Sequence, residues 1–278
     1  MLTLRAPSRW WTSFALALCV LCMSSCTSLT TRFAGWYVTR EIDRYLDLTS
    51  EQQHVLRAHV DAQLSRLRRD ELPKWLTLLR ELRDQMDRGT SEVAIARLQR
   101  RTDALLDHTA HLLIPEVSQL LSKLDADQIA HFEREMLEEH EEKHEEEEAL
   151  DEQLVEAIES LVDDLQVTQQ ETIRRAARAL PDRRPQRYRV DKQRILSTAA
   201  LLRTHPGPQA IQQELTRLWT TRYDVLGPDC DRDSIRTEQR RFFLLVDGTL
   251  SREQRDYAVE QLSDRIRSVK RFLLPVDG

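Results

Sequence analysis

Apolar side chains recur every three or four positions along nearly the whole chain, and this spacing is what most constrains its fold. Charged residues fill the positions between them, as they do on helices that bury one face and expose the other. The apolar stripes are clearest in the segments 56–67, 72–86, 117–124 and 258–273. We therefore expect an all-α protein, an elongated bundle of about eight amphipathic helices. Some should be long and kinked, and one should carry a highly acidic exposed stretch.

Composition agrees with helices and argues against several classes of function. Only 6 of the 278 residues are Gly, and no convincing alternating strand pattern is present, which favours helix over sheet. The net charge of -6 argues against a general nucleic-acid binder, because such proteins carry a strong excess of basic residues. Neither a Gly-rich phosphate loop nor a Gly-x-Ser-x-Gly motif occurs in the sequence, so these two common catalytic signatures are absent.

The first 26 residues have the pattern of a targeting segment. Arg5 and Arg9 precede an apolar stretch over residues 14–23, which is short for a membrane-spanning helix. The stretch ends in Met23-Ser24-Ser25-Cys26. This resembles a bacterial lipobox, in which the Cys is lipidated and becomes the first residue of the mature chain. We expect a lipoprotein signal peptide over residues 1–25; the alternative is an ordinary secretory signal or an uncleaved anchor.

Lipidation of Cys26 implies a location. The covalent lipid, with palmitate-type acyl chains, would provide stable membrane anchoring. Thr27 follows the Cys, whereas in bacterial lipoproteins Asp at that position favours retention in the inner membrane. We therefore expect a Gram-negative envelope protein that is anchored in the outer membrane with its body in the periplasm. The mature helical body over residues 26–278 would be one unit or two halves, 30–165 and 166–278.

One short signal recurs at expected helix starts. The segments 48–52 (Leu-Thr-Ser-Glu-Gln), 124–128 (Leu-Asp-Ala-Asp-Gln) and 250–254 (Leu-Ser-Arg-Glu-Gln) match a capping box, and a weaker copy over 167–171 would place its cap at Thr168. In such a box the cap side chain accepts a backbone hydrogen bond and the Gln returns one to the cap. The pattern predicts these helix-cap pairs: Thr49 with Gln52, Asp125 with Gln128, and Ser251 with Gln254.

Two resemblances follow from these segments. The Leu-Thr-x-x-Gln box is similar to the recurring motif of Spy/CpxP-type periplasmic proteins, which implies a helical cradle for unfolded clients. The chain also resembles an uncharacterised family of bacterial helical lipoproteins, through Trp36-Tyr37, the Asp-Arg-Tyr-Leu-Asp-Leu-Thr-Ser-Glu-Gln segment 43–52, and the Arg-Arg-Asp-Glu-Leu-Pro-Lys-Trp segment 68–75. Family members often carry Trp-His where this chain has Arg66-Leu67. The family implies a fold and a compartment but no activity.

His140 and His144 form the sharpest candidate for chemistry. With Glu141 they match His-Glu-x-x-His, in which two His on one helix face share a zinc ion. The surrounding segment is rich in Glu, so we interpret the match as fortuitous and expect no catalytic residues. A metal-binding site without catalysis is the alternative. An exposed helix or a helical hairpin tip accounts for the segment most simply.

Charge is strongly segregated in two segments. Residues 133–148 contain ten Glu and two basic residues, whereas residues 174–194 contain nine basic and two acidic residues. We interpret them as two solvated faces, which could face each other. The alternative is a basic surface for lipid phosphates or an acidic client.

These observations favour a non-enzymatic binding protein, chaperone-like or active in envelope maintenance. Its binding surface would be an amphipathic groove lined by Leu72, Trp75 and Trp219. Metal binding through His140 and His144 is one alternative, and a structural adaptor that docks another envelope protein through the acidic helix is another. Apart from the covalent lipid on Cys26 we expect no cofactor. The expected partners are the membrane, through the lipid anchor, and unfolded or envelope proteins.

Overall fold

The computed structural model describes residues 27–145, 149–223 and 231–273. Within these ranges the chain forms eleven α-helices and no strand, which confirms the all-α prediction, although the expected count of about eight was low. The helices are α2 (Thr27–Leu46), α3 (Ser50–Asp70), α4 (Leu72–Arg88), α5 (Glu92–Leu121), α6 (Ala126–Glu145), α7 (Leu150–Val162), α8 (Val167–Arg178), α9 (Arg184–Leu202), α10 (Pro208–Thr220), α11 (Arg232–Thr249) and α12 (Arg252–Leu273).

Local signals set many of these boundaries. Pro73 lies in the first turn of α4, where its missing N–H costs no helical hydrogen bond. Gly89 ends α4 with a φ of 80°, a conformation that suits Gly. The Ser91 side chain then caps α5 by accepting from the Ala94 N–H. Pro115, in contrast, lies inside α5.

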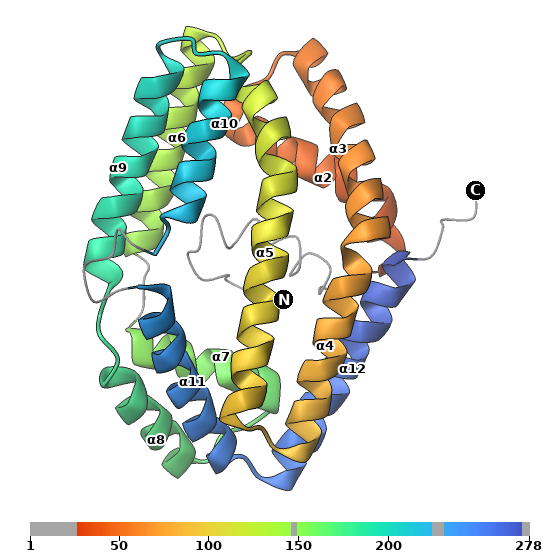
Figure 1. Cartoon of the computed structure of the whole chain (residues 1–278), viewed down its shortest axis with the longest axis vertical. Coiled ribbons are helices and arrows are strands. Elements are labelled where there is room, and N and C mark those ends of the chain that lie inside the picture. Colours follow the sequence, from red (N-terminus) through yellow and green to blue (C-terminus); the bar gives the residue numbers. More distant parts are fainter. Residues whose placement is uncertain (1–26, 146–148, 224–230, 274–278) are drawn as a thin grey trace.

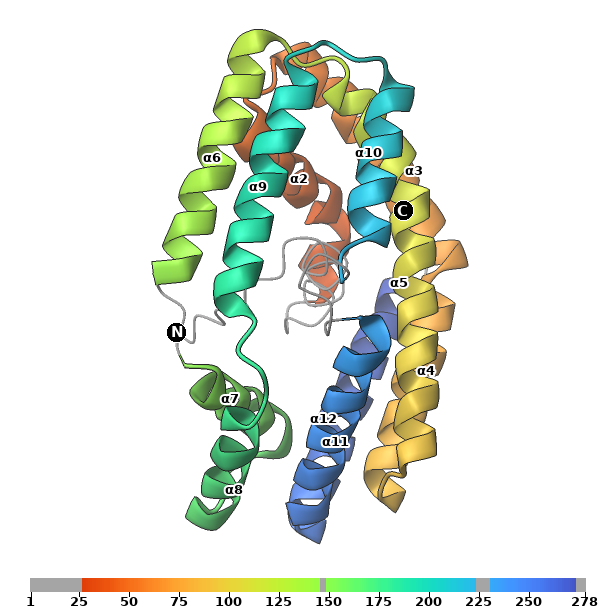
Figure 2. The same cartoon turned by 60° about the vertical axis from the view of Figure 1, so that its left-hand side comes forward.

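The helices run mainly along one long axis, and α5 extends through much of the body (Figure 1). α10 packs against α5, and α11 packs against it further down (Figure 2). α10 therefore packs along the upper part of α5 and α11 along its lower part. None of the helices in the described ranges is both long and apolar enough to span a membrane.

The order of helices and their contacts repeats within the chain. In the first part α2 packs against α3 and α6, and in the second part α7 packs against α8 and α12. The next helix of each part packs against the other part. α4, in the first part, packs against α12 in the second, and α9, in the second part, packs against α6 in the first. The packing therefore interlocks the segment before residue 146 with the segment after residue 148.

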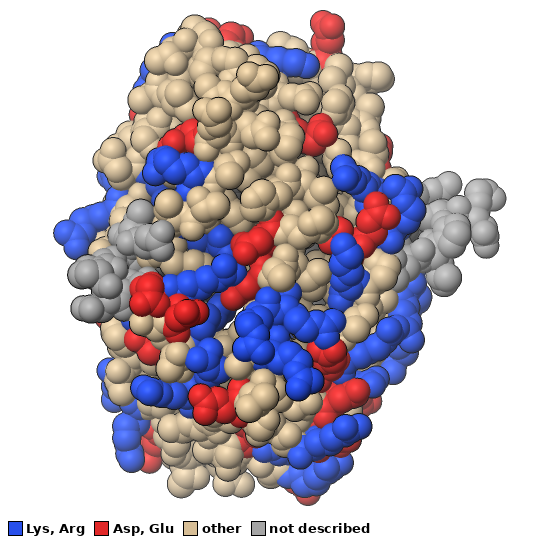
Figure 3. Space-filling view, in the orientation of Figure 1, with Lys and Arg blue, Asp and Glu red and all other residues tan. Residues whose placement is uncertain are grey.

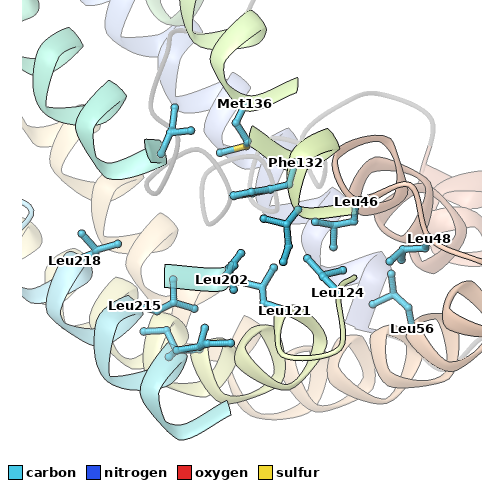
Figure 4. Packing of buried hydrophobic residues seen from close by; sticks show 14 of the residues in the cluster. Leu46, Leu48, Leu56, Leu121, Leu124, Phe132, Met136, Leu202, Leu215 and Leu218 are labelled. Atoms are coloured by element: carbon cyan, nitrogen blue, oxygen red, sulfur yellow. The ribbon is translucent and has the colours of Figure 1, made fainter. Parts of the chain in front are cut away.

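Buried apolar side chains form two large clusters. The upper core lies in the upper part of Figure 1 and combines residues of α2, α3, α5, α6, α9 and α10. Figure 4 shows Leu121, Leu124 and Phe132 of this cluster near Leu202 and Leu215. The lower core joins α7, α8, α11 and α12 around Ile173 and Ala258. A smaller cluster between α4 and α12 contains Leu72, Leu76, Ile266 and Val269.

Candidate functional site

The capping boxes meet in pairs at the two ends of the molecule. The upper hub consists of segments 48–52 and 124–128, and the lower hub of segments 165–169 and 250–254 (Figure 1). Within each box the Gln side-chain oxygen accepts a hydrogen bond from the backbone N–H of the cap residue. The N···O distances are 2.9 Å at Thr49, 3.2 Å at Asp125, 2.8 Å at Gln166 and 3.0 Å at Ser251. The predicted caps at Thr49, Asp125 and Ser251 are therefore present.

Each hub is closed by a reciprocal pair of Gln side chains. Gln52 and Gln128 exchange hydrogen bonds of 3.2 and 2.8 Å. Gln169 and Gln254 exchange bonds of 2.8 and 3.0 Å. Each Gln Nε2 also donates to a backbone carbonyl just before the partner box, for example from Gln254 to Asp164 at 2.8 Å. The amide groups are thus satisfied although three of the four Gln side chains are buried.

The third box begins two residues before the position that the sequence suggested. The prediction of a cap at Thr168 is wrong, because α8 begins at Val167 and Gln166 occupies the cap position. Gln is not among the favoured cap residues, which is why the capping rule misses it. A pattern shared by all four boxes, Leu-x-x-x-Gln, does locate it.

The lower hub allows a direct measurement of coupling. Gln169→Ala and Gln254→Ala should each lower the free energy of unfolding by about 1–3 kcal/mol, because each leaves a buried amide unpaired. The double variant should lose less unfolding free energy than the sum of the losses of the two single variants. Chemical denaturation of the three variants measures this coupling. As a control, Gln212→Ala, at an exposed position of α10, should change the free energy of unfolding by less than about 0.5 kcal/mol. Strict additivity at the hub would contradict the paired arrangement.

His140 and His144 are engaged with α9. Their rings stack on the Tyr188 ring with centroid distances of 4.6 and 4.2 Å. The Nε2 atom of His140 lies 2.9 Å from the Tyr188 carbonyl oxygen. Within the described residues, no group of three or more His, Cys, Asp or Glu side chains could hold a metal ion. In the described structure both His side chains pack against Tyr188 of α9.

This packing predicts the behaviour of the double variant His140→Ala/His144→Ala. It should lower the free energy of unfolding by about 1–2 kcal/mol, because two stacked aromatic contacts are lost. Metal analysis of the purified proteins should give the same metal content per chain for parent and variant. A stoichiometric transition metal in the parent that the variant lacks would contradict the packing role and restore the metal-binding alternative.

The acidic and basic segments meet in part. Lys192 donates to Glu141 at 2.9 Å, and Arg203 pairs with Glu133, so α6 and α9 are joined by ion pairs. Burial raises the pKa of Glu139, but hydrogen bonds from Lys143 and Tyr45 lower it below its usual value. Other basic residues of the run pair elsewhere, as Arg183 does with Glu238. α6 ends at Glu145 and α7 begins at Leu150.

The three expected groove residues lie in different surroundings. Leu72 is buried between α4 and α12. Trp219 is only 2% exposed in the upper core, and its Nε1 donates to Asp107 at 3.0 Å. Trp75 is partly buried against the same core. The structure thus does not bring Leu72 and Trp219 together on an open face, because both serve helix packing.

A partly buried charge network lies between α5, the C-terminal end of α10 and the N-terminal end of α11. Asp103, on α5, contacts Arg232 and Arg236, and its side chain is 10% exposed. Asp107, one turn later, accepts from Trp219, Arg222 and Arg232. Burial raises the pKa of Asp107, but the hydrogen bond and charge of Arg222, with the charge of Arg232, lower it below its usual value. No local sequence pattern predicts this network, because its partners are more than 100 residues apart.

The model of one protein family, described as a family of unknown function (DUF6279), matches residues 44–229 of the chain. The chain belongs to this family. Comparisons with curated proteins and with solved structures gave no match.

The DUF6279 match includes the upper hub, both candidate His residues, and Trp75 and Trp219. It also includes the 68–75 segment, one of the three segments on which the resemblance rests. There Glu71 is 2% exposed, and its Oε1 accepts from Lys74 Nζ at 2.8 Å and lies 3.0 Å from His108 Nε2. Glu71 therefore ties the junction between α3 and α4 to α5.

Large exposed apolar side chains remain as the candidate contact surface. Four of them, the distal apolar residues, lie on α5, α8 and α11, the helices at or beside the lower hub: Val93, Val167, Phe243 and Leu245. Their helices are held together by hydrogen bonds from Thr90 N–H to the Asp247 carboxylate and from Gln169 Nε2 to the Thr249 carbonyl. Cys26, the expected lipidation site, lies outside the described residues.

Proposed function

We propose that this protein is a lipid-anchored envelope protein that acts by binding other proteins rather than by catalysis. The anchor rests on the lipobox-like segment that ends in Cys26, and the outer membrane on Thr27 after it. The observation that carries the binding function is the exposure of the distal apolar residues. Phe243 is 52% exposed and Val167 is 70% exposed.

The chemistry of these side chains suits an extended or unfolded polypeptide. Phe243 and Leu245 lie on α11, and Val93 and Val167 lie at the starts of α5 and α8, which pack against α11, so these side chains offer several small apolar contact areas. Unfolded clients expose apolar side chains that would bury area against them. The resemblance of the boxes to Spy/CpxP-type proteins supports the same proposal. The metal-binding alternative is less favoured, because the Nε2 of His140 already lies 2.9 Å from the Tyr188 carbonyl oxygen.

Aggregation of an unfolded model client tests the proposal. The body from residue 27 onward should suppress aggregation at near-stoichiometric ratios. Phe243→Ser/Leu245→Ser should weaken suppression several-fold. The matched control, Val55→Ser/Val117→Ser, removes two exposed apolar side chains near the opposite hub and should retain it. Thermal unfolding of both variants checks that the fold is intact. Absence of suppression by the parent, or equal losses in both variants, would count against the proposal.

One observation favours the adaptor function as a second candidate. Glu138, Glu141, Glu142 and Glu145 are all exposed and follow a helical spacing on the outer side of α6. A basic patch on another envelope protein would complement this acidic stripe. Charge reversal of Glu138, Glu142 and Glu145 should then abolish co-purification of a specific partner from envelope extracts. Unchanged co-purification would remove this candidate.

A further inference from the structure

An aromatic and basic face is exposed on α2. Trp36 and Tyr37 are 49% and 44% exposed, and the Arg40 guanidinium lies 5.3 Å from the centre of the Trp36 ring. The opposite side of α2 is committed to packing. Gly35 is buried there, and a Cβ atom at this position would lie 1.9 Å from the Asp61 carboxylate on α3. Close packing against α3 therefore fixes the outward direction of Trp36 and Tyr37.

The position of this face in the chain links it to the membrane. Cys26 immediately precedes the first residue of α2, Thr27. Trp36 lies nine residues further on, or about 14 Å along a helix. If Cys26 carries the anchor of the proposed function, Trp36 and Tyr37 lie near the lipid headgroups. Trp and Tyr are the side chains that favour this region, because each combines an apolar ring with a polar edge.

A basic helix end lies beside this face. α12 packs against α2, and Figures 1 and 2 show its C-terminal end near the N-terminal part of α2. Residues 265–271 contain four basic and no acidic residues. Lys270 and Arg271 are exposed, whereas Arg267 pairs with Asp264. Lys and Arg atoms also gather on the right-hand flank in Figure 3, where α4 and α12 lie. This charge complements anionic headgroups.

We propose that the outer face of α2 and the C-terminal end of α12 together dock on an anionic phospholipid surface. Arg40, Lys270 and Arg271 contact lipid phosphates, while the rings of Trp36 and Tyr37 lie at the level of the headgroups. The inference rests on the proposed lipid anchor. It adds a second membrane contact that fixes the orientation of the body, since acyl chains and a basic surface reinforce each other.

Quenching of Trp fluorescence by brominated lipids tests this docking. The lipidated protein, purified from membranes, is reconstituted into vesicles of phosphatidylethanolamine with phosphatidylglycerol, or of phosphatidylcholine alone. Flotation establishes anchoring in both. We expect quenching in the anionic vesicles and at least a two-fold weaker effect in the neutral ones. Trp36→Phe should abolish the quenching, because Trp75 is partly buried and Trp219 is buried in the helical body.

Charge reversal provides the matched comparison. Lys270→Glu/Arg271→Glu should reduce the quenching at least two-fold. Arg187→Glu/Arg189→Glu makes the same change of charge at exposed positions of α9 and should leave it unchanged. Flotation without quenching of Trp36 would overturn the docking while retaining the anchor. Equal quenching in both lipid compositions, or equal effects of the two reversals, would also overturn it. Failure to float would overturn the anchor and the docking together.

Discussion

Replacing Asp103 by Ala is expected to lower the free energy of unfolding by about 3–5 kcal/mol, because it leaves buried arginine charge without its counter-ion. The Asp103 carboxylate accepts from the Nε of Arg236 at 3.1 Å and from the Nε of Arg232 at 3.3 Å. The Arg236 side chain is 15% exposed, so water cannot easily replace the lost partner. The network also joins α5 to α11, and its loss should loosen that contact.

Chemical denaturation measures this effect. Asp84→Ala is a matched control, since it removes a carboxylate that pairs with Arg83 at 44% exposure. Exposed pairs of that kind contribute at most about 1 kcal/mol. Asp103→Asn, which keeps the shape and one acceptor, should be intermediate. A loss below about 1 kcal/mol for Asp103→Ala would show that the buried network does not hold α5 and α11 together.

Trp219→Ala is the second change with a large expected effect, about 3–5 kcal/mol of unfolding free energy. The indole fills the upper core at 2% exposure. The substitution would leave a cavity and remove the bond to Asp107. The Arg222 guanidinium, which lies 4.1 Å from the centre of the Trp219 ring, would lose that contact as well. The groove hypothesis for this residue predicts the opposite, a stable fold with impaired binding.

Trp219→Phe separates the two contributions. Phe keeps an aromatic ring in the core but cannot donate to Asp107, so we expect a smaller loss in unfolding free energy. Thermal and chemical unfolding should rank the variants in the order parent, Phe, Ala. If Trp219→Ala unfolds like the parent, the indole does not occupy the core as described, and a role in binding becomes the better explanation.

The fold class and the three strongest caps follow from local spacing, because capping relates residues three positions apart. The pairing of the boxes does not, since the Gln side chains meet across 76 residues in the upper hub and 85 in the lower. A box seen alone predicts only a helix start. The helix count was low because short helices such as α7 and α8, with 13 and 12 residues, merge with their neighbours in an apolar pattern.

Aromatic and charged residues were harder to place. Trp219 and Trp36 have the same side chain, yet one fills a core and the other is half exposed. Their difference arises from partners elsewhere in the chain, Asp107 for Trp219 and the close approach at Gly35 for α2. Likewise, the His140 and His144 pattern is shared by metal sites and by packed helices, and their stacking on Tyr188, which lies on another helix, cannot be read from the pattern.

The proposed membrane anchor and the docking of α2 and α12 both depend on the lipid at Cys26, and the mass of the protein purified from membranes tests it most directly. Our account predicts a chain that begins at Cys26 and carries diacylglyceryl and N-acyl groups. It also predicts that Cys26→Ala abolishes this modification and the anchoring that depends on it. A membrane-bound chain that begins at Met1, or any mature chain with an unmodified Cys26, would contradict the account.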